Sequence, residues 1–299
     1  MVRFELVPKG PFSLAASAAF LEGFAPAAHR AGEAGHLHLA FVADGGEAAA
    51  GVCLRQPDAD VAAEMFGDAD PAAVQAQVAR ILSLDVDGGG FPEVGRRDPV
   101  VGRLQARWPG LRPVGFFSPY EAAAWSLIGQ RIRIVQAARI KERMAAELGE
   151  AVDVHGDLRH AFPGPARLAD LEGFPGLFGR KAEYLRALGA AAMTGRLDAA
   201  RLRGMPRHQA LAALKELPGV GDFSAELILL RGVGDSDHLP EHEPRLRRAV
   251  ALAYGLDGPP GDLQLAQLAE RWRPYRTWVV LLLRVLLEET TSEIRGAGG

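Results

Sequence analysis

The chain has 299 residues, 48% of them hydrophobic and 24% charged, with a formal net charge of −3. This is an ordinary globular composition, with enough chain for one large domain or two smaller ones. No run approaches the roughly 18 to 20 apolar residues of a membrane helix, and the start of the chain lacks the apolar core of a signal peptide, so we expect a cytoplasmic protein that does not cross a membrane.

Cysteine and histidine usage restricts the metal chemistry to be expected. A single cysteine, Cys53, cannot make an internal disulfide, an iron–sulfur cluster or a cysteine-based zinc site. Its surroundings indicate a strand, and we expect a small core residue there. His36 and His38 are two apart on one face of a predicted strand, with no other cluster of ligand spacing beside them. Metal binding there is not expected.

Charge is unevenly distributed along the chain. Residues 1–100 contain 7 basic and 14 acidic residues, a net charge of −7. Residues 101–299 contain 27 basic and 23 acidic residues, a net charge of +4. The second part is therefore the better candidate for contact with an anionic partner, although a charge of this size is weak support by itself.

The first hundred residues alternate between strand-like and helical patterns. Alternating apolar residues predict strands, and apolar residues at helical spacing predict helices. The pattern predicts, in chain order, a strand at 4–7, a helix at 13–24, a strand at 36–42, a hairpin turn at 44–46, a strand at 48–54 and a helix at 59–82. We predict a small α+β unit with an antiparallel sheet over residues 1–113, ending in a stretch rich in proline and glycine.

From residue 114 to 299 the pattern is a series of helices with short breaks. Ser118 is placed as an N-cap, with Pro119 at the first helical position and Glu121 three residues after the cap. The predicted helices start at 118 and continue at 131–148, 179–195, 198–204, 206–217, 222–232, 244–254, 263–272 and 276–290. An all-α domain over 114–299 follows, with a tail from Arg295 that we expect to be frayed.

The most informative segment is 214–230, where a helix stops, Pro218-Gly-Val-Gly221 makes a tight hairpin and a second helix begins at once. Two glycines around one apolar residue let the backbone approach a ligand and present successive N–H groups beside a helix N-terminus. That geometry binds phosphate without reading a base. The four residues alone are also compatible with a simple turn.

The segment resembles the helix–hairpin–helix of the DNA glycosylase superfamily, and the whole chain is similar to its 3-methyladenine DNA glycosylase II branch. The resemblance covers nearly the whole chain. Its motifs occur in the family's order at 11–14, 127–130, 181–185, 195–198, 214–232 and 271–276. It implies excision of a damaged base that is rotated out of the DNA duplex.

In this family an aspartate, followed by the pattern x-x-Leu-Arg-Arg, stabilises the oxocarbenium-like sugar and positions the attacking water. The matching residue here is Glu243, which the resemblance implies as the catalytic carboxylate. It departs from the family by one methylene group, a displacement that can cost on the order of 10²-fold in rate. Glu241 and His242 could share the role, and Glu243 could instead only complement a helix N-terminus.

The resemblance also implies the residues of a base pocket and of a wedge. Two positions that carry aromatic rings in a bacterial member of the family align with Leu227 and Arg284. Phe223 is the candidate stacking residue, with Trp125, Trp272, Tyr275 and Trp278 as further candidates, although each of these rings is more often a core residue than a pocket residue. Arg131 occupies the wedge position that fills the gap left by a flipped base, and it can equally be a solvated arginine.

Contacts with DNA are implied at the hairpin and at nearby basic residues. They are the N–H groups of Gly219, Val220 and Gly221, with Ser224, Arg131, Lys181 and Arg245. A structural monovalent cation is implied at the backbone carbonyls around Lys215, Leu217 and Val220, and no other cofactor is expected. Asp222 stands where strand-cleaving relatives carry a lysine, so no Schiff base can form there.

The resulting hypothesis is a monofunctional glycosylase for alkylated purines, acting as a monomer on damaged double-stranded DNA in the cytoplasm at the nucleoid. Two alternatives stay open. One is a protein with this fold that binds DNA lesions but has lost or changed its chemistry, motivated by the changes at Glu243, Leu227 and Arg284. The other is a glycosylase for oxidised or deaminated bases.

Overall fold

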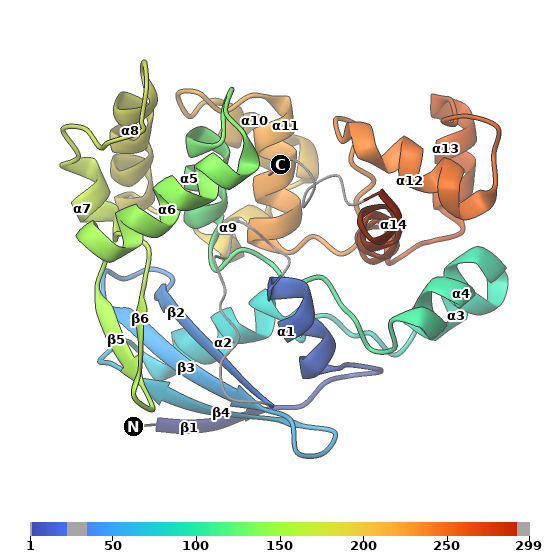
Figure 1. Cartoon of the computed structure of the whole chain (residues 1–299), viewed down its shortest axis with the longest axis horizontal. Coiled ribbons are helices and arrows are strands. Elements are labelled where there is room, and N and C mark those ends of the chain that lie inside the picture. The colour runs from blue at the N-terminus through green and yellow to red at the C-terminus, as the bar shows by residue number, and fades with distance from the viewer. Residues whose placement is uncertain (1, 23–34, 292–299) are drawn as a thin grey trace.

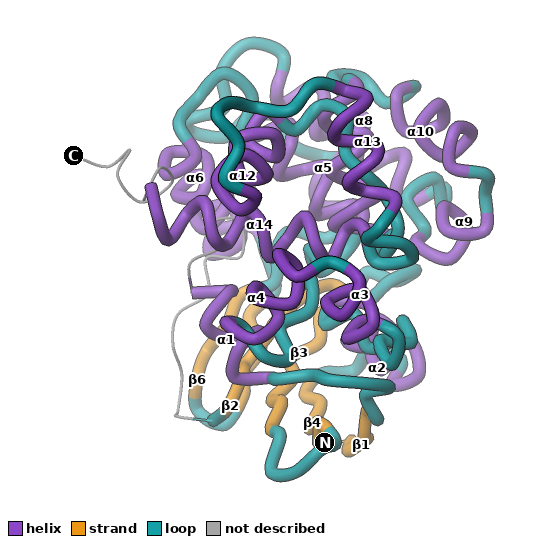
Figure 2. Tube along the Cα trace, turned by 90° about the vertical axis from the view of Figure 1, so that its right-hand side faces the viewer, coloured by secondary structure: helices purple, strands orange, loops and turns teal. Residues whose placement is uncertain are grey.

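The computed structural model describes residues 2–22 and 35–291. Strands gather at one end of the molecule and most helices at the other, as Figures 1 and 2 show. The predicted α+β class is therefore confirmed. Within the described residues, none of the helices combines the length and apolar character needed to cross a bilayer.

Four antiparallel strands form the sheet, in the order β1 (Val2–Leu6), β4 (Val61–Phe66), β3 (Ala49–Arg55) and β2 (His36–Val42). One face packs against α1 (Leu14–Glu22) and α2 (Pro71–Ile81) in a core of aliphatic and aromatic side chains. Strands β2 and β3 follow the predicted hairpin closely. Helix α1 begins near the predicted residue 13, and the last predicted residue, Phe24, lies outside the described part.

The prediction of one helix over residues 59–82 is wrong in its first part, because this part forms the extended strand β4. Its residues pair on both sides, for example Met65 with Val2 of β1 and with Val52 of β3. Tertiary pairing overrides the helical propensity of the two alanines in this segment. Asp70 then caps α2 by accepting a hydrogen bond from the N–H of Ala73, so the helix starts ten residues later than β4 does.

A helical layer lies above the sheet in Figure 1, built around α5 (Pro119–Ile128), whose ten residues are all buried. Its other elements are α6 (Ile134–Leu148), α7 (Pro165–Ala169), α8 (Lys181–Met193), α9 (Ala199–Gly204), α10 (Arg207–Lys215), α11 (Asp222–Leu227) and the π-helical turn η2 (Ile228–Val233). The predicted helices are confirmed here, and α7 was not predicted. Ser118 caps α5 as expected, accepting from the N–H of Glu121 at 3.0 Å.

A third group of helices contains α12 (Pro244–Tyr254), α13 (Asp262–Glu270) and α14 (Arg276–Thr291). Their shared core includes the fully buried Trp272 and Trp278. Two unpredicted helices, α3 (Phe91–Arg97) and α4 (Pro99–Arg107), pack into the same core although they precede residue 113. The domain boundary at 113 stays a prediction. The predicted frayed tail lies outside the described residues.

The part expected to be all-α contains a short hairpin, β5 (Ala151–Val154) and β6 (Asp157–His160). Figure 1 shows it extending from the helical layer down to the sheet. Gly51 of β3 lies directly beneath it, and a Cβ atom there would be 2.6 Å from Val154 and 2.8 Å from Val152. Glycine at this position therefore allows β5 to approach the sheet on the face opposite α2.

Candidate active site and nucleic-acid interface

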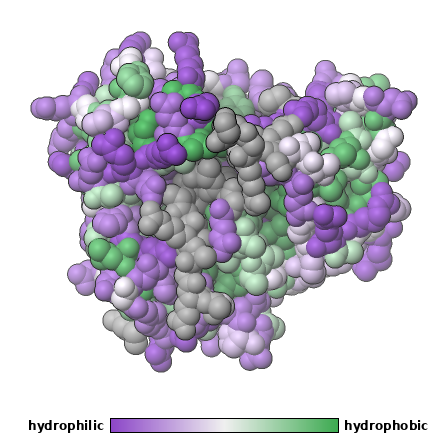
Figure 3. Space-filling view, in the orientation of Figure 1, coloured by the Kyte–Doolittle hydropathy of each residue, from purple (hydrophilic) through white to green (hydrophobic). Residues whose placement is uncertain are grey.

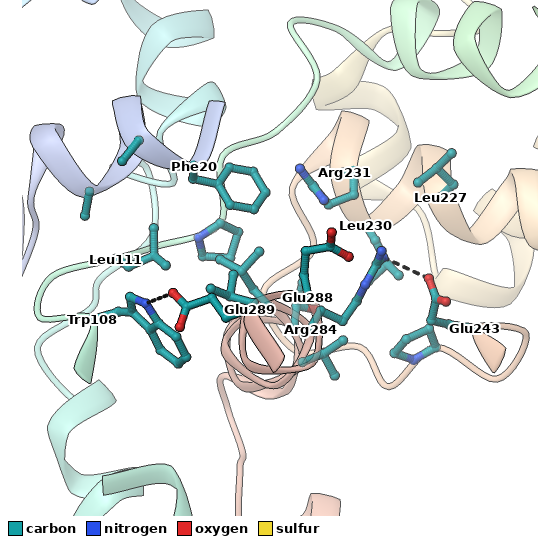
Figure 4. Close-up of a pocket in the computed structure, with 18 of the residues that line it drawn as sticks. Phe20, Trp108, Leu111, Leu227, Leu230, Arg231, Glu243, Arg284, Glu288 and Glu289 are labelled. Atoms are coloured by element: carbon teal, nitrogen blue, oxygen red, sulfur yellow. Dashed lines mark hydrogen bonds and ion pairs between the residues drawn. The ribbon is translucent and has the colours of Figure 1, made fainter. Parts of the chain in front are cut away.

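A cavity of about 660 Å³ opens between α1, the segment around Trp108, η2 and α14 (Figure 4). On the face in Figure 3, hydrophobic residues gather over α1 and toward α14. The apolar lining of the cavity includes Phe20, Leu111, Leu227, Leu230 and Leu281. Such a lining, with a small number of charged groups, is typical of a site for a small organic ligand.

Glu243 lies at this cavity as the N-cap of α12, which begins at Pro244 as predicted. One carboxylate oxygen, Oε1, accepts a hydrogen bond from the N–H of Arg245 at 3.2 Å. The other, Oε2, is 2.9 Å from Nη1 of Arg284 on α14. Only 14% of the Glu243 side chain is exposed. The carboxylate is therefore held in one orientation, with a cation beside it.

Glu226 fixes the loop that carries Glu243. Its two carboxylate oxygens accept hydrogen bonds from the backbone N–H groups of Glu241 at 3.1 Å and His242 at 3.0 Å. The Glu226 side chain is buried, and Nδ1 of His242 lies 3.1 Å from it. Glu241 and His242, the alternative candidates for the catalytic role, line a neighbouring depression and not the cavity.

A second arginine, Arg231, contributes positive charge on the same side of the cavity. Its side chain is half-buried, and its Nη2 donates to the carbonyl of Val114 at 2.6 Å. The pKa of its guanidinium is lowered to about 9, chiefly by loss of hydration and also by the charge of Arg284, while the charge of Glu243 opposes the shift. The ring of Phe20 lies 5.5 Å from the guanidinium carbon. Figure 4 shows the two arginines on this side of the cavity together with the carboxylates of Glu243 and Glu288.

A second ion pair lies at the opposite side of the cavity. Glu289 of α14 accepts a hydrogen bond from Nε1 of Trp108 at 3.1 Å and is 2.7 Å from Nη2 of Arg107. This arrangement fixes the indole ring of Trp108 at the cavity wall, as Figure 4 shows. Charged side chains of both signs are therefore present at both sides of the apolar lining.

The structure brings three of the four predicted pocket residues to the cavity, namely Phe223, Leu227 and Arg284. The fourth, Trp125, packs in the core of the helical layer and is not among the lining residues. Trp125 belongs to α5, which is surrounded by other helices, so its ring serves the core. Sequence reasoning missed Phe20 and Trp108, which come from other parts of the chain and carry no local motif. It also gave no role to Arg231, although this residue lies within the motif at 214–232.

The predicted hairpin lies between α10 and α11. Gly219 has φ +83°, and a Cβ atom there would lie 2.5 Å from the ring of Tyr184, so only glycine fits. The N–H of Val220 donates to the carbonyl of Leu217 at 3.0 Å, which closes the turn and occupies one predicted phosphate donor. A carbonyl keeps a second lone pair, so those of Lys215, Leu217 and Val220 stay compatible with a monovalent cation.

The predicted wedge residue lies next to this hairpin. Gln130 Nε2 donates to the carbonyl of Gly219 at 2.7 Å and so ties the loop between α5 and α6 to the hairpin. Arg131, the next residue, is exposed and has φ +57°, a conformation that residues other than glycine rarely adopt. The fold therefore presents an arginine side chain on a strained loop beside the predicted phosphate contacts.

Two predicted DNA contacts are not at the surface. Lys181 is buried, and its Nζ donates to the carbonyl of Ile128 at 2.8 Å, where it complements the C-terminal end of α5. Burial lowers the pKa of this ammonium group. Ser224 is buried as well. Arg245 remains partly exposed beside Glu243, and Asp222 forms an ion pair of 2.9 Å with Lys215.

Comparison with curated proteins gives several relatives, and no protein-family model matches the chain. The DNA-3-methyladenine glycosylase 2 of Escherichia coli is 31% identical over 219 residues, which are 71% of this chain and 72% of that protein. A probable bifunctional transcriptional activator/DNA repair enzyme AlkA of Mycobacterium tuberculosis is 31% identical over 230 residues, 75% of this chain. The chain spans about half of that relative, 45% of its length.

Solved structures share the fold. The 3-methyladenine DNA-glycosylase of Archaeoglobus fulgidus has a TM-score of 0.78 at 23% identity, covering 98% of this chain and 100% of that one. The 8-oxoguanine glycosylase/lyase of Clostridium acetobutylicum, in complex with double-stranded DNA, has a TM-score of 0.62 at 18% identity, covering 87% of this chain and 88% of that one. These likenesses extend over both the sheet and the helical layer.

Proposed function

The chain belongs to the DNA-3-methyladenine glycosylase family of the helix–hairpin–helix fold, and from this premise we propose that it excises alkylated purines from DNA by hydrolysing the N-glycosidic bond. The observation that carries the proposal is Glu243, a carboxylate held in a fixed orientation at a cavity of about 660 Å³. That volume is in the range of sites for small organic ligands, about 300 to 1,000 Å³.

The proposed reaction starts when the damaged nucleotide rotates out of the duplex and its base enters the cavity. Leu227 and Leu230 would pack against the base. As the C1′–N bond breaks, positive charge develops on the sugar, and the carboxylate of Glu243 would stabilise it. A water molecule then adds its oxygen to C1′ and gives one proton to Glu243, while the base leaves with the electron pair. A cationic alkylated purine leaves neutral, so no general acid is needed.

We also propose that the reaction stops at base removal. Strand cleavage would need an amine that forms a Schiff base with the sugar. Asp222 cannot supply one, and the amine of Lys215 is engaged in an ion pair with Asp222. The expected products are a free base and an intact strand with an abasic site.

Binding of damaged double-stranded DNA is proposed to use the hairpin and the adjacent loop. The N–H groups of Gly219 and Gly221 would contact the phosphate backbone, with Arg245 at the start of α12 as a further contact and Arg131 as the wedge. These contacts carry affinity without sequence preference and make binding dependent on salt. We also propose that the protein acts as a monomer. It would need no cofactor beyond a structural monovalent cation at the hairpin carbonyls.

The proposed excision is tested by measuring release of 3-methyladenine and 7-methylguanine from methylated duplex DNA under single-turnover conditions. Glu243→Gln should abolish release, because an amide cannot stabilise the sugar cation or accept a proton. Glu243→Asp restores the family's residue and should keep or raise the rate. Glu241→Gln is the matched control, since this neighbour lies outside the cavity, and it should release both bases at the wild-type rate. Wild-type release by Glu243→Gln would refute the role of Glu243.

A second candidate function rests on the two arginines beside Glu243. Arg231 and Arg284 repel a cationic base and favour a neutral base with hydrogen-bond acceptors, which points to an oxidised or deaminated lesion. The same assay with duplexes containing 8-oxoguanine or hypoxanthine separates the two functions. Lesion-selective binding without release of any of these bases would favour a protein that recognises damage without cleaving it.

A further inference from the structure

A cluster of polar side chains lies on the face of the sheet opposite α2, and none of its residues lines the cavity. His38 of β2 is directly opposite Cys53 of β3 in the antiparallel register, and His36 is two residues before His38. All three side chains are therefore on one face of the sheet. Their ligand atoms lie within 4.8 Å of one another, and Cys53 is fully buried. From the sequence, His36 and His38 were paired without a third donor and Cys53 was expected only as a core residue, because strand pairing is needed to bring the three together.

We propose that His36, His38 and Cys53 bind a zinc ion between the sheet and the β5–β6 hairpin. Thiolate sulfur and imidazole nitrogen are the donors that zinc prefers, whereas magnesium and calcium require oxygen. The Cys53 sulfur is 3.7 Å from Nδ1 of His36. Ligand atoms of a tetrahedral zinc site are separated by about 3.3 to 3.6 Å, so small side-chain movements bring the three donors to an ion.

An independent observation at His38 points to a ligand. This histidine is only 5% exposed, and within the described residues its Nε2 atom has no hydrogen-bond partner. Burying an unpaired polar atom is costly, and a bound ion would remove that cost. The proposal therefore explains an atom that the packing of the hairpin leaves unsatisfied.

The other ring nitrogen of His38 has the partner that metal-binding histidines usually have. Its Nδ1 lies 3.0 Å from the Asp157 carboxylate, on the turn side of β6. Donation of the Nδ1 proton to Asp157 leaves a lone pair on Nε2, which is the form that coordinates a metal. Asp157 belongs to the hairpin and His38 to the sheet, so a bound ion would fasten these two elements together.

His155 closes the hairpin side of the cluster. Its ring centroid lies 6.1 Å from that of His38, and its Nε2 is 2.8 Å from the Glu64 carboxylate. Glu64 is itself directly opposite Cys53 in the register. His155 is therefore a boundary of the site and not one of its three ligands, and a water molecule takes the fourth position of the zinc ion.

Metal titration of the purified full-length chain tests the proposal. The protein is stripped with a chelator, and Co²⁺ is added as a spectroscopic probe. We expect one Co²⁺ per chain, with tetrahedral visible bands and a near-ultraviolet thiolate-to-cobalt band, both displaced by one equivalent of Zn²⁺. Cys53→Ser should lose the thiolate band, and His38→Gln should lose stoichiometric binding. His160→Gln, an exposed histidine on the same hairpin, is the matched control and should bind like the wild type.

A second variant separates the proposed site from a structural polar cluster. Asp157→Ala leaves all three ligands in place but removes the partner of His38, so the affinity for Zn²⁺ should fall by about 10- to 100-fold. Zn²⁺ should also raise the Tm of the wild type and not that of Cys53→Ser, with circular dichroism confirming that both are folded. No stoichiometric binding, or equal binding by Cys53→Ser and His38→Gln, would overturn the proposal. Base release depends on the separate cavity, so neither outcome affects the proposed excision.

Discussion

Nη1 of Arg284 lies 2.9 Å from Oε2 of Glu243, and this ion pair joins α14 to the start of α12 across the cavity. The second carboxylate oxygen accepts the N–H of Arg245. The carboxylate is thus oriented by two donors, and the base site has a fixed cation at its edge. Arg284 orients the carboxylate for both lesion classes considered for the cavity, but its charge repels only a cationic base.

Replacing Arg284 by methionine should therefore change the choice of lesion. Two like charges 4 Å apart repel by about 4 kcal/mol at an effective dielectric constant of about 20. Arg284→Met should raise the ratio of 7-methylguanine release to hypoxanthine release by about tenfold or more. If Glu243 loses its orientation and release of both bases slows by the same factor, the ratio of the two rates does not change. Arg103→Met, at an exposed position of α4, is the control, and an unchanged ratio in Arg284→Met would exclude electrostatic selection by this residue.

Replacing Arg131 by glycine should affect stability and base flipping in opposite directions. Its φ of +57° is unfavourable for arginine by about 1 to 2 kcal/mol and is easily adopted by glycine. Arg131→Gly should therefore keep or raise the free energy of unfolding, while base flipping, followed with a fluorescent adenine analogue next to the lesion, becomes weaker. Arg133→Ala, an exposed neighbour, should retain both properties. A glycine variant that flips bases as the wild type does would show that Arg131 is not the wedge.

Much of the fold was predictable where the signal is local. Ser118 caps α5, and Pro244 begins α12 at the predicted residue, because capping and proline geometry depend only on neighbouring residues. Strand β4 was not predictable in this way. Its residues Ala62 and Ala63 favour a helix in isolation, and they become extended only because β1 and β3 pair with them on both sides.

The site was predictable only in part for the same reason. The resemblance placed Glu243, Leu227 and Arg284, and all three reach the cavity. Phe20 and Trp108 are far away in the sequence and arrive there through the packing of α1 and of the segment after α4. Lys181 illustrates the reverse case. A lysine at the start of a helix suggests a surface cation, but its ammonium group is directed inward to the end of α5.

Breaking the buried ion pair between Glu121 and Lys141 should strongly destabilise the helical layer. Their charged atoms are 2.7 Å apart, and both side chains are less than 8% exposed. Lys141→Met leaves a buried carboxylate without a cation and should cost about 3 to 5 kcal/mol in urea unfolding, whereas Glu121→Gln combined with Lys141→Met should cost less. The exposed pair of Arg143 and Glu147 is the control, and Arg143→Met should cost about 0.5 kcal/mol or less.

Stability should fall in acid because of Glu64. Burial raises the pKa of this carboxyl, but Arg3, Arg55 and His155 outweigh that effect and hold the pKa below its usual value of 4.5. Its stabilising contribution is therefore complete above pH 4.5 and is lost as the pH falls through the lower pKa of the folded state. With a chelator present, the Tm of the wild type should decrease more than that of Glu64→Gln between about pH 5 and pH 3. Glu5→Gln, at an exposed position of β1, should behave like the wild type, and parallel curves for Glu64→Gln would contradict this assignment.

The two glycines of the hairpin allow folding and DNA binding to be separated. Gly219 has φ +83° and contacts Tyr184 closely, so Gly219→Ala should lower both stability and affinity for DNA. At Gly221, by contrast, a Cβ atom would meet no other atom within 4 Å, and φ is −98°. Gly221→Ala should therefore leave the free energy of unfolding within about 0.5 kcal/mol of the wild type.

If the DNA backbone approaches the N–H of Gly221, the added methyl group will obstruct it. Gly221→Ala should then bind a duplex with an abasic-site analogue at least about tenfold more weakly, measured by fluorescence anisotropy at a fixed salt concentration. Gly258→Ala, which also has no neighbour within 4 Å of its Cβ position, should bind like the wild type. Equal affinity of Gly221→Ala and Gly258→Ala would place the phosphate contact outside the hairpin, because the substitution changes the surface of the turn without changing its fold.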